Sequence, residues 1–272
     1  MMRQQNLVLD ILTENVRNLN NQVWHEDVLT EEDKTILKRE SESSDMFDKL
    51  QLRKNLYNDF VNSRAFTVVK KNSQARVVIL TTNKEQVYPW ELWSKIFEWF
   101  GKPSNGSHWQ IYLYASGTER ILPSEGPIGP EHLNGGYTYP CRPDCIVIYR
   151  YEEATRVLIH ELLHASCTDN HDNSVEVKEA ATEAWTELFL VALLSNGNKK
   201  KAHELWRIQD HYIQDLNYTV RTFHHVNSPS DYGARYTIMR EKVFEDFGIL
   251  LDKKYQPKRI VTSRFTSVKL HQ

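Results

Sequence analysis

The chain has 272 residues, of which 40% are hydrophobic and 26% charged, a composition typical of a globular protein rather than a disordered one. The formal net charge of -2 gives no electrostatic basis for binding nucleic acid or an anionic membrane surface. No apolar run approaches the roughly 18 residues of a membrane-spanning helix. Asp10 interrupts the first apolar run, so no secretory signal peptide is predicted. We therefore expect an intracellular, cytoplasmic protein.

The first part of the chain predicts two helices separated by a polar stretch. Apolar residues recur at helical spacing over residues 5–24 and again over residues 46–61. Residues 25–48 are polar and acidic, and Ser41–Asp45 has the composition of a linker. We interpret residues 1–65 as a helical N-terminal extension, which can serve as a prosegment, a docking arm or additional packing on the main domain.

Residues 66–272 are expected to form the main domain, in which strands precede helices. β-branched runs mark the strands, and apolar spacing with Gly and Pro breakers marks the helices. The predicted strands are 75–81, 108–115 and 145–149, with an extended segment at 135–139 after a loop at 116–134, and the predicted helices are 89–100, 152–168, 174–195, 199–217 and 231–247. This order predicts an α+β fold with a small mixed sheet and a mainly helical C-terminal half.

The three cysteines are too few for a disulfide framework, so a reducing compartment is the simplest expectation. Cys141 and Cys145 lie four positions apart in a Pro-rich stretch and could form a second metal-binding pair. Two thiolates alone, however, do not complete a structural zinc site.

The segment with the clearest chemistry is His160-Glu161-Leu162-Leu163-His164, within a predicted helix. Histidines four positions apart share one helix face, so their rings can bind one ion, with Zn–N distances of about 2.0 Å. Glu161 follows the first histidine and can take a proton from a zinc-bound water, whose pKa falls to about 7. The sequence therefore predicts Zn2+ at His160 and His164, with Glu161 as the general base. The alternative is a chance motif with two buried, hydrogen-bonded histidines.

A catalytic zinc needs a third protein ligand and one open position. Glu183 lies eighteen residues beyond the motif, in the next predicted helix, and a turn between the helices would bring it back toward the histidines. Glu187 lies one helical turn further, where it can accept the free ring N–H of a zinc-bound histidine. Four other assignments of the third ligand remain open: Glu179, Glu187, Asp169 and His171.

The motif, the eighteen-residue gap and Glu183 within Thr182-Glu183-Ala184-Trp185 resemble the gluzincins, which include the thermolysin-like peptidases and a group of aminopeptidases. In the thermolysin-like enzymes a second acidic residue also follows the glutamate ligand by four positions, which Glu187 matches. The resemblance implies a zincin-like fold with an active-site helix, Zn2+ as cofactor and a peptide or protein substrate. Residues 134–190 are also similar to uncharacterised zincin-like proteins of large DNA viruses, which implies a viral protein, with virion association as a further location.

The chain also departs from related patterns. The aminopeptidase sequence Gly-x-Met-Glu-Asn is absent, so specificity for a free N-terminus is not implied. The metzincin pattern requires glycine at position 167 and histidine at position 170, whereas this chain has Cys167 and Asn170.

The segment Asn134-Gly135-Gly136-Tyr137-Thr138 resembles the edge strand that aligns the substrate in zincins. An edge strand offers unpaired N–H and C=O groups to any peptide backbone, and glycine permits close approach. We therefore expect Asn134, Gly135 and Gly136 to bind the substrate. The alternative is a plain Gly-Gly turn.

Gluzincins also use a tyrosine or a histidine to stabilise the oxyanion, a role that requires a donor aimed at the developing charge. Tyr236 is the first candidate and Tyr232 the second, since Ser228–Asp231 looks like a helix start that places both on one face. His224 and His225 are the alternatives.

These features predict a zinc-dependent peptidase. The alternative is a zincin-fold scaffold or virion component whose catalysis is incidental or lost, although the intact Glu161 argues against it. Neither a nucleic-acid partner nor a membrane is expected, and the oligomeric state is not predicted.

Overall fold

The structure is a computed structural model that describes residues 6–43, 46–104, 106 and 108–271. These residues form two compact units, which we call the sheet unit and the helical unit. The sheet unit comprises Asn20–Glu119 and Asn134–Asp169, and the helical unit comprises Met1–Leu19, Arg120–Leu133 and Asn170–Gln272. The predicted α+β class is confirmed. Ser44 and Asp45, part of the expected linker, lie outside the described residues.

The sheet unit is built on a mixed sheet with the strand order β1-β2-β3-β4-β6-β5. Its strands are β1 (His25–Glu26), β2 (Phe66–Lys71), β3 (Ala75–Thr81), β4 (Trp109–Tyr114), β5 (Gly136–Thr138) and β6 (Ile146–Ile148). β3, β4 and β6 run parallel, whereas the outer pairings β1–β2, β2–β3 and β5–β6 are antiparallel. The side chains of Val77–Leu80 in β3 are fully buried, as expected for a strand covered on both faces.

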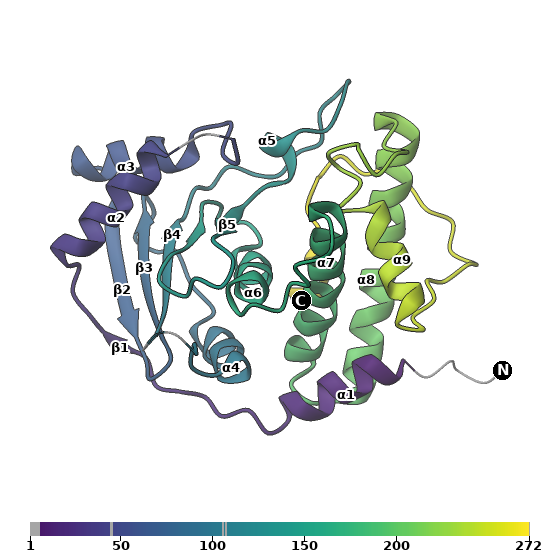
Figure 1. Ribbon diagram of the computed structural model, residues 1–272, viewed down its shortest axis with the longest axis horizontal. Coiled ribbons are helices and arrows are strands. Elements are labelled where there is room, and N and C mark those ends of the chain that lie inside the picture. Colours follow the sequence, from purple (N-terminus) through teal and green to yellow (C-terminus); the bar gives the residue numbers. More distant parts are fainter. Residues whose placement is uncertain (1–5, 44–45, 105, 107, 272) are drawn as a thin grey trace. The chain divides into compact units, whose positions relative to one another are not determined.

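Helices cover both faces of this sheet (Figure 1). α2 (Glu31–Glu42) and α3 (Leu52–Val61) lie on one face, where α3 contacts β3 and β4. α4 (Trp90–Phe100) and α6 (Ala154–Ala165) lie on the other, where α6 contacts β5 and β6. α4 begins after Pro89 and ends at Gly101, whose positive φ of 67° suits glycine and terminates the helix. The sequence predicted both of its ends.

The helix α2 was not predicted, because its residues are mostly polar. Its start is fixed by a capping box, in which the Thr30 side chain accepts from Asp33 N and the Asp33 side chain accepts from Thr30 N. Leu37 is fully buried in the apolar cluster between this helix and the sheet. Tertiary packing and capping therefore form a helix where the expectation was a linker.

The helical unit is centred on α7 (Val175–Ser195), which contacts α1 (Leu7–Val16), α8 (Lys199–His224) and α9 (Ile238–Asp246). The short helix α5 (Pro130–Leu133) and the 3-10 helix η1 (Val268–His271) complete it. Residues 1–65 are thus divided between the units, because α1 packs in the helical unit while α2 and α3 pack on the sheet.

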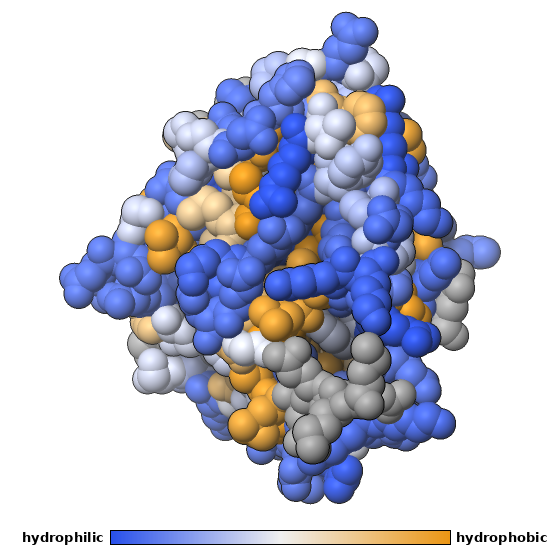
Figure 2. Space-filling model, turned by 90° about the vertical axis from the view of Figure 1, so that its right-hand side faces the viewer, coloured by the Kyte–Doolittle hydropathy of each residue, from blue (hydrophilic) through white to orange (hydrophobic). Residues whose placement is uncertain are grey.

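The mean hydropathy of -0.58 reflects a composition rich in polar residues. Figure 2 shows one face, on which hydrophilic residues predominate and hydrophobic residues gather in smaller patches. Within the described part of the chain, no helix combines the length and apolar character needed to cross a membrane.

Candidate metal centre

The helix α6 carries the three residues of the predicted motif. It packs on β5 and β6 through apolar residues such as Leu158 and Ile159, which are fully buried. His160 and Glu161 are also buried. Two imidazoles and a carboxylate are therefore held on a helix that the sheet fixes in place.

The two histidine rings converge. His160 Nε2 and His164 Nε2 lie 3.2 Å apart, because positions i and i+4 stack on one helix face. Two nitrogens bound at about 2.0–2.1 Å to one tetrahedral zinc ion lie about 3.3 Å apart. The observed separation thus fits the bite of a zinc ion. It also fits a hydrogen bond between the rings, which metal binding would replace.

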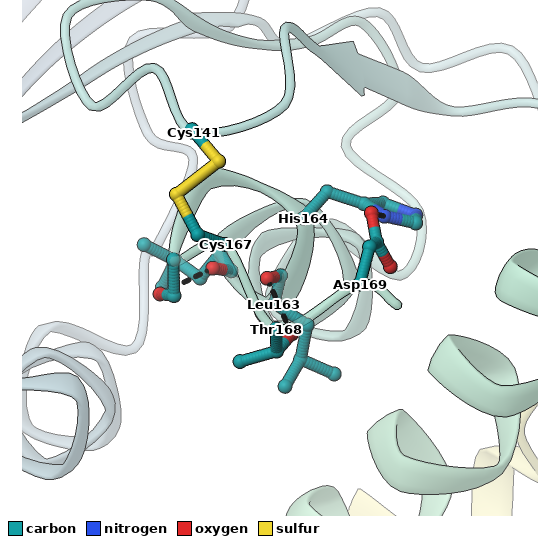
Figure 3. Close-up of a disulfide and its surroundings, with 8 residues drawn as sticks. Cys141, Leu163, His164, Cys167, Thr168 and Asp169 are labelled. Carbon is teal, nitrogen blue, oxygen red and sulfur yellow. Dashed lines mark hydrogen bonds and ion pairs between the residues drawn. A yellow bond between two sulfur atoms is a disulfide. The ribbon is translucent and has the colours of Figure 1, made fainter. Parts of the chain in front are cut away.

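The Asp169 carboxylate contacts the other ring nitrogen of His164. Its Oδ2 lies 2.7 Å from His164 Nδ1, so the carboxylate favours the tautomer with the proton on Nδ1 and an unprotonated Nε2, the form in which a histidine binds a metal. Figure 3 shows the Asp169 carboxylate against this ring. The sequence offers Asp169 as an alternative metal ligand, whereas its contact with Nδ1 makes it a residue that orients His164.

The chain just beyond α6 is pinned by a disulfide between Cys141 and Cys167 (Figure 3). This pairing corrects the expectation of reduced cysteines. Because Cys141 is in the disulfide, it does not form a metal-binding pair with Cys145. Cys145 is free and buried, and burial raises the pKa of its thiol to about 12, so it is not a metal-binding thiolate at neutral pH. The disulfide joins the connection between β5 and β6 to the residue three positions after His164.

Glu161 lies against the strand β5. A Cβ added to Gly136 would come within 2.6 Å of Val157 Cγ1, 2.8 Å of Val147 O and 3.2 Å of Glu161 Oε1. Only glycine therefore lets the strand approach α6 this closely. The predicted general base is thus in contact range of the segment that the sequence assigned to substrate binding.

β5 is the outermost strand at its end of the sheet order. Tyr149 N donates to Gly135 O at 2.8 Å, and antiparallel pairs alternate between hydrogen-bonded and non-hydrogen-bonded. The backbone groups of Gly136 and Thr138 therefore point away from β6. The alternative of a plain Gly-Gly turn is wrong, because Gly136 belongs to the strand. The Asn134 side chain is engaged within the unit, where Nδ2 donates to Phe47 O at 3.3 Å.

The predicted third ligand belongs to α7, in the helical unit. Glu179, Glu183 and Glu187 follow one another at intervals of four, so they share one face of this helix. Glu183 and Glu187 are buried and Glu179 is half-buried. Glu187 accepts from Arg240 Nη1 at 2.7 Å and from Gln209 Nε2. The Glu187 carboxylate is therefore part of a buried ion pair. Its role as the acceptor of a histidine N–H stays a prediction.

Tyr232 and Tyr236 also belong to the helical unit, where their rings lie 5.5 Å apart. They do not lie on a helix: residues 228–237 form turns, and α9 begins only at Ile238. The predicted helix start is wrong because the Asp231 side chain accepts from the backbone N–H groups of Asn227 and Ser228. It closes a turn with preceding residues instead of capping following ones.

Tyr236 is a strong candidate donor within its unit. Burial raises its pKa well above the usual value, and the negative charge of Glu179 raises the pKa further. The phenol therefore keeps its proton at neutral pH, as an oxyanion donor must. His224, an alternative, is buried with Nδ1 3.3 Å from Gly126 O. His225 ends α8 in the left-handed region with a φ of 54° and is exposed.

No protein-family model, curated protein or solved structure matches this chain. Inference about its function therefore rests on its own residues and their geometry.

Proposed function

We propose that this chain is a zinc-dependent peptidase in which His160 and His164 bind the metal and Glu161 is the general base. The carrying observation is the pair of Nε2 atoms 3.2 Å apart on α6, since this spacing suits two ligands of one tetrahedral ion. The Asp169 carboxylate on His164 Nδ1 supports it, because zinc-binding histidines usually donate their second N–H to such a group.

The third ligand in this proposal is a carboxylate of α7. Glu183 is the first candidate, from its spacing to the motif. Glu179 is the alternative, because it is another acidic residue on the same face of α7 as Glu183. A ligand set of two imidazoles and one carboxylate suits catalytic zinc, and it leaves a fourth position for water or substrate.

In the proposed hydrolysis, each of these residues has a separate role. When bound, zinc would polarise the scissile carbonyl and lower the pKa of a water to about 7. Glu161 accepts the proton of the attacking water and passes it to the departing amine. The outward backbone groups of β5 hold the substrate extended, and Tyr236, or Tyr232, donates to the oxyanion.

Metal analysis of purified variants tests the ligand set. The wild-type protein should retain one zinc per chain after dialysis, and Glu161→Gln should retain it as well. Glu183→Gln should lose it if that residue is the ligand, whereas Glu179→Gln should lose it under the alternative. Glu176→Gln, a change of the same kind on the same helix, is the matched control and should keep the zinc. A folded wild-type protein that takes up no zinc would refute the proposal.

Hydrolysis of quenched fluorescent peptides tests the reaction. Glu161→Gln should lower kcat by about 10²–10⁴ with zinc still bound, because the carboxamide cannot accept a proton. A zinc-loaded wild-type protein that cleaves no peptide would favour the scaffold function instead. Equal kcat in wild type and variant would remove Glu161 from the mechanism.

A further inference from the structure

The segment Met46–Leu50 lies against the β5 end of the sheet, although α2 and α3 flank it in sequence. Phe47 O accepts from Tyr149 Oη at 2.6 Å and from Asn134 Nδ2 at 3.3 Å. Since Tyr149 is almost fully buried, these two bonds tie the loop to the residues that precede β5 and follow β6. The position of Phe47 is therefore fixed.

The Phe47 ring extends an aromatic surface that starts on β5. It stacks on Tyr137 with a centroid distance of 5.7 Å and an interplanar angle of 20°. Tyr137 meets Tyr139 edge-on at 6.4 Å. Yet Phe47 remains 45% exposed and Tyr139 48%. Met46 and Leu50 in the same loop are also exposed.

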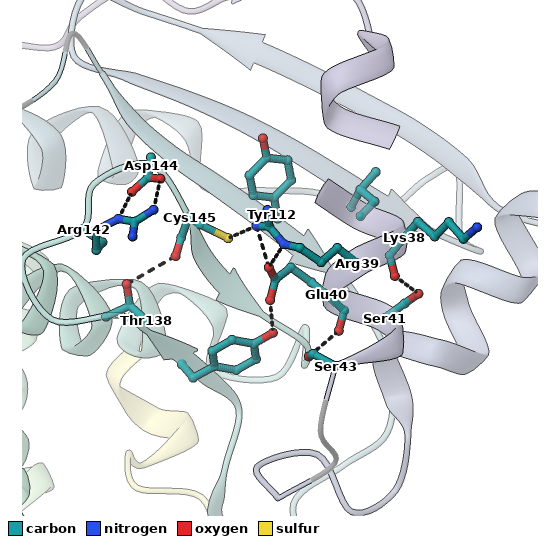
Figure 4. Close-up of polar contacts among 12 residues, drawn as sticks. Lys38, Arg39, Glu40, Ser41, Ser43, Tyr112, Thr138, Arg142, Asp144 and Cys145 are labelled. Atoms are coloured by element: carbon teal, nitrogen blue, oxygen red, sulfur yellow. Dashed lines mark hydrogen bonds and ion pairs between the residues drawn. The ribbon is translucent and has the colours of Figure 1, made fainter. Parts of the chain in front are cut away.

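Two buried charged residues, Glu40 and Arg53, hold the Tyr137 side chain in position. Its hydroxyl donates to Glu40 Oε2 at 2.6 Å, and the Arg53 guanidinium lies 4.9 Å from the ring centroid. Figure 4 shows Glu40 beside Arg39 and Cys145 on this side of the sheet. These contacts fix the Tyr137 side chain. A rigid apolar surface binds a ligand with a small loss of conformational entropy.

Strand alternation relates this surface to the proposed substrate. Gly136 faces α6 and Glu161, so the next residue, Tyr137, points to the opposite face of the sheet. A peptide paired along the outer side of β5 alternates in the same way. The substrate residue opposite Tyr137 directs its side chain to that face.

We propose that Phe47, Tyr137 and Tyr139 form a specificity subsite that takes a bulky aromatic or aliphatic substrate side chain, one residue away from a side chain facing Glu161. This inference rests on the proposed peptidase function. Phe47 comes from an N-terminal segment, whereas Tyr137 and Tyr139 come from β5 and the residue after it. Contact between two aromatic rings contributes about 0.5–1.5 kcal/mol beyond area burial, which corresponds to a preference of about two- to tenfold.

Peptide binding to the zinc-loaded Glu161→Gln protein tests the subsite without catalysis. The probes are fluorescein-labelled hexapeptides of Ala, Gly and Ser in which one Phe occupies each position in turn. One register should bind about two- to tenfold tighter than the all-small peptide. Phe47→Ala should abolish that preference, and Phe47→Leu, which keeps an apolar side chain at this position, should retain part of it. Val61→Ala, which removes an exposed apolar side chain at the end of α3, is the matched control and should change nothing.

The outcomes separate the two proposals. A preference lost in folded, zinc-loaded Phe47→Ala supports the subsite. A preference that is absent in the parent protein, or unchanged in Phe47→Ala, overturns it. If the preference depends on Phe47 but the wild-type protein cleaves none of these peptides, the subsite stands and the peptidase function fails.

Discussion

Replacing Gly136 by alanine should drive β5 away from α6. The added Cβ would lie 2.6 Å from Val157 Cγ1 and 2.8 Å from Val147 O, and carbon and oxygen atoms do not approach this closely. The valine methyl can rotate, but the carbonyl belongs to the paired strand β6. The strand must therefore shift, and this loosens the bond from Tyr149 N to Gly135 O, which is 2.8 Å long.

Overpacking of this kind costs about 1–3 kcal/mol in the free energy of unfolding. Gly117→Ala is the matched control, because a Cβ there meets no described atom within 4 Å. That change should instead stabilise by about 0.4–1 kcal/mol by restricting the unfolded chain. Urea unfolding followed by tryptophan fluorescence measures both. Hydrolysis by Gly136→Ala should fall as well, since the same Cβ lies 3.2 Å from Glu161 Oε1.

Val157→Ala in the Gly136→Ala background removes one of the two close contacts but not the carbonyl. The double variant should therefore recover part of the lost stability, with a coupling of about 0.5–3 kcal/mol between neighbouring sites. If Gly136→Ala is as stable as Gly117→Ala, or if the two changes are strictly additive, the close approach of β5 to α6 is wrong.

Three further changes probe other parts of the chain. Cys141→Ser opens a disulfide loop with a sequence separation of 26 and should lower the free energy of unfolding by about 3.5 kcal/mol, a difference that a reducing agent should abolish. Arg240→Met should cost about 3–5 kcal/mol, because it leaves the fully buried Glu187 without its ion pair at 2.7 Å; denaturant titration that finds Arg240→Met and Arg240→Met/Glu187→Leu equally unstable would contradict this. Asp169→Asn should weaken zinc binding about 10- to 100-fold, measured by chelator competition, since His164 loses its orienting carboxylate; an unchanged affinity would remove Asp169 from the site.

Much of the fold could be predicted because local pattern and tertiary packing agree. The β-branched run of β3 and the Pro-to-Gly limits of α4 gave correct elements. The convergence of His160 and His164 was also predictable, because helix geometry alone fixes positions i and i+4. Where these local rules apply, the sequence determines distances as well as element types.

The failures occur where one side chain can satisfy two different local structures. Asp231 can cap a following helix or close a preceding turn, and only the folded chain decides between them. Thr30 and Asp33 form a capping box that was visible in the sequence, but the polar composition of the residues after it favoured a linker. In both regions, weak apolar periodicity left the assignment to tertiary contacts.

The parts of the site that the sequence did not predict are contacts between separate segments, or contacts made where the chain leaves a helix. The pairing of Cys141 with Cys167 joins the β5–β6 connection to the end of α6, and Asp169 reaches His164 only because the chain turns back after that helix. Spacing along one helix cannot predict either contact. Both fix the segment next to His164, and the proposed metal ligands on α6 need such support to keep their geometry. We therefore infer that the precision of the centre depends on residues beyond the motif.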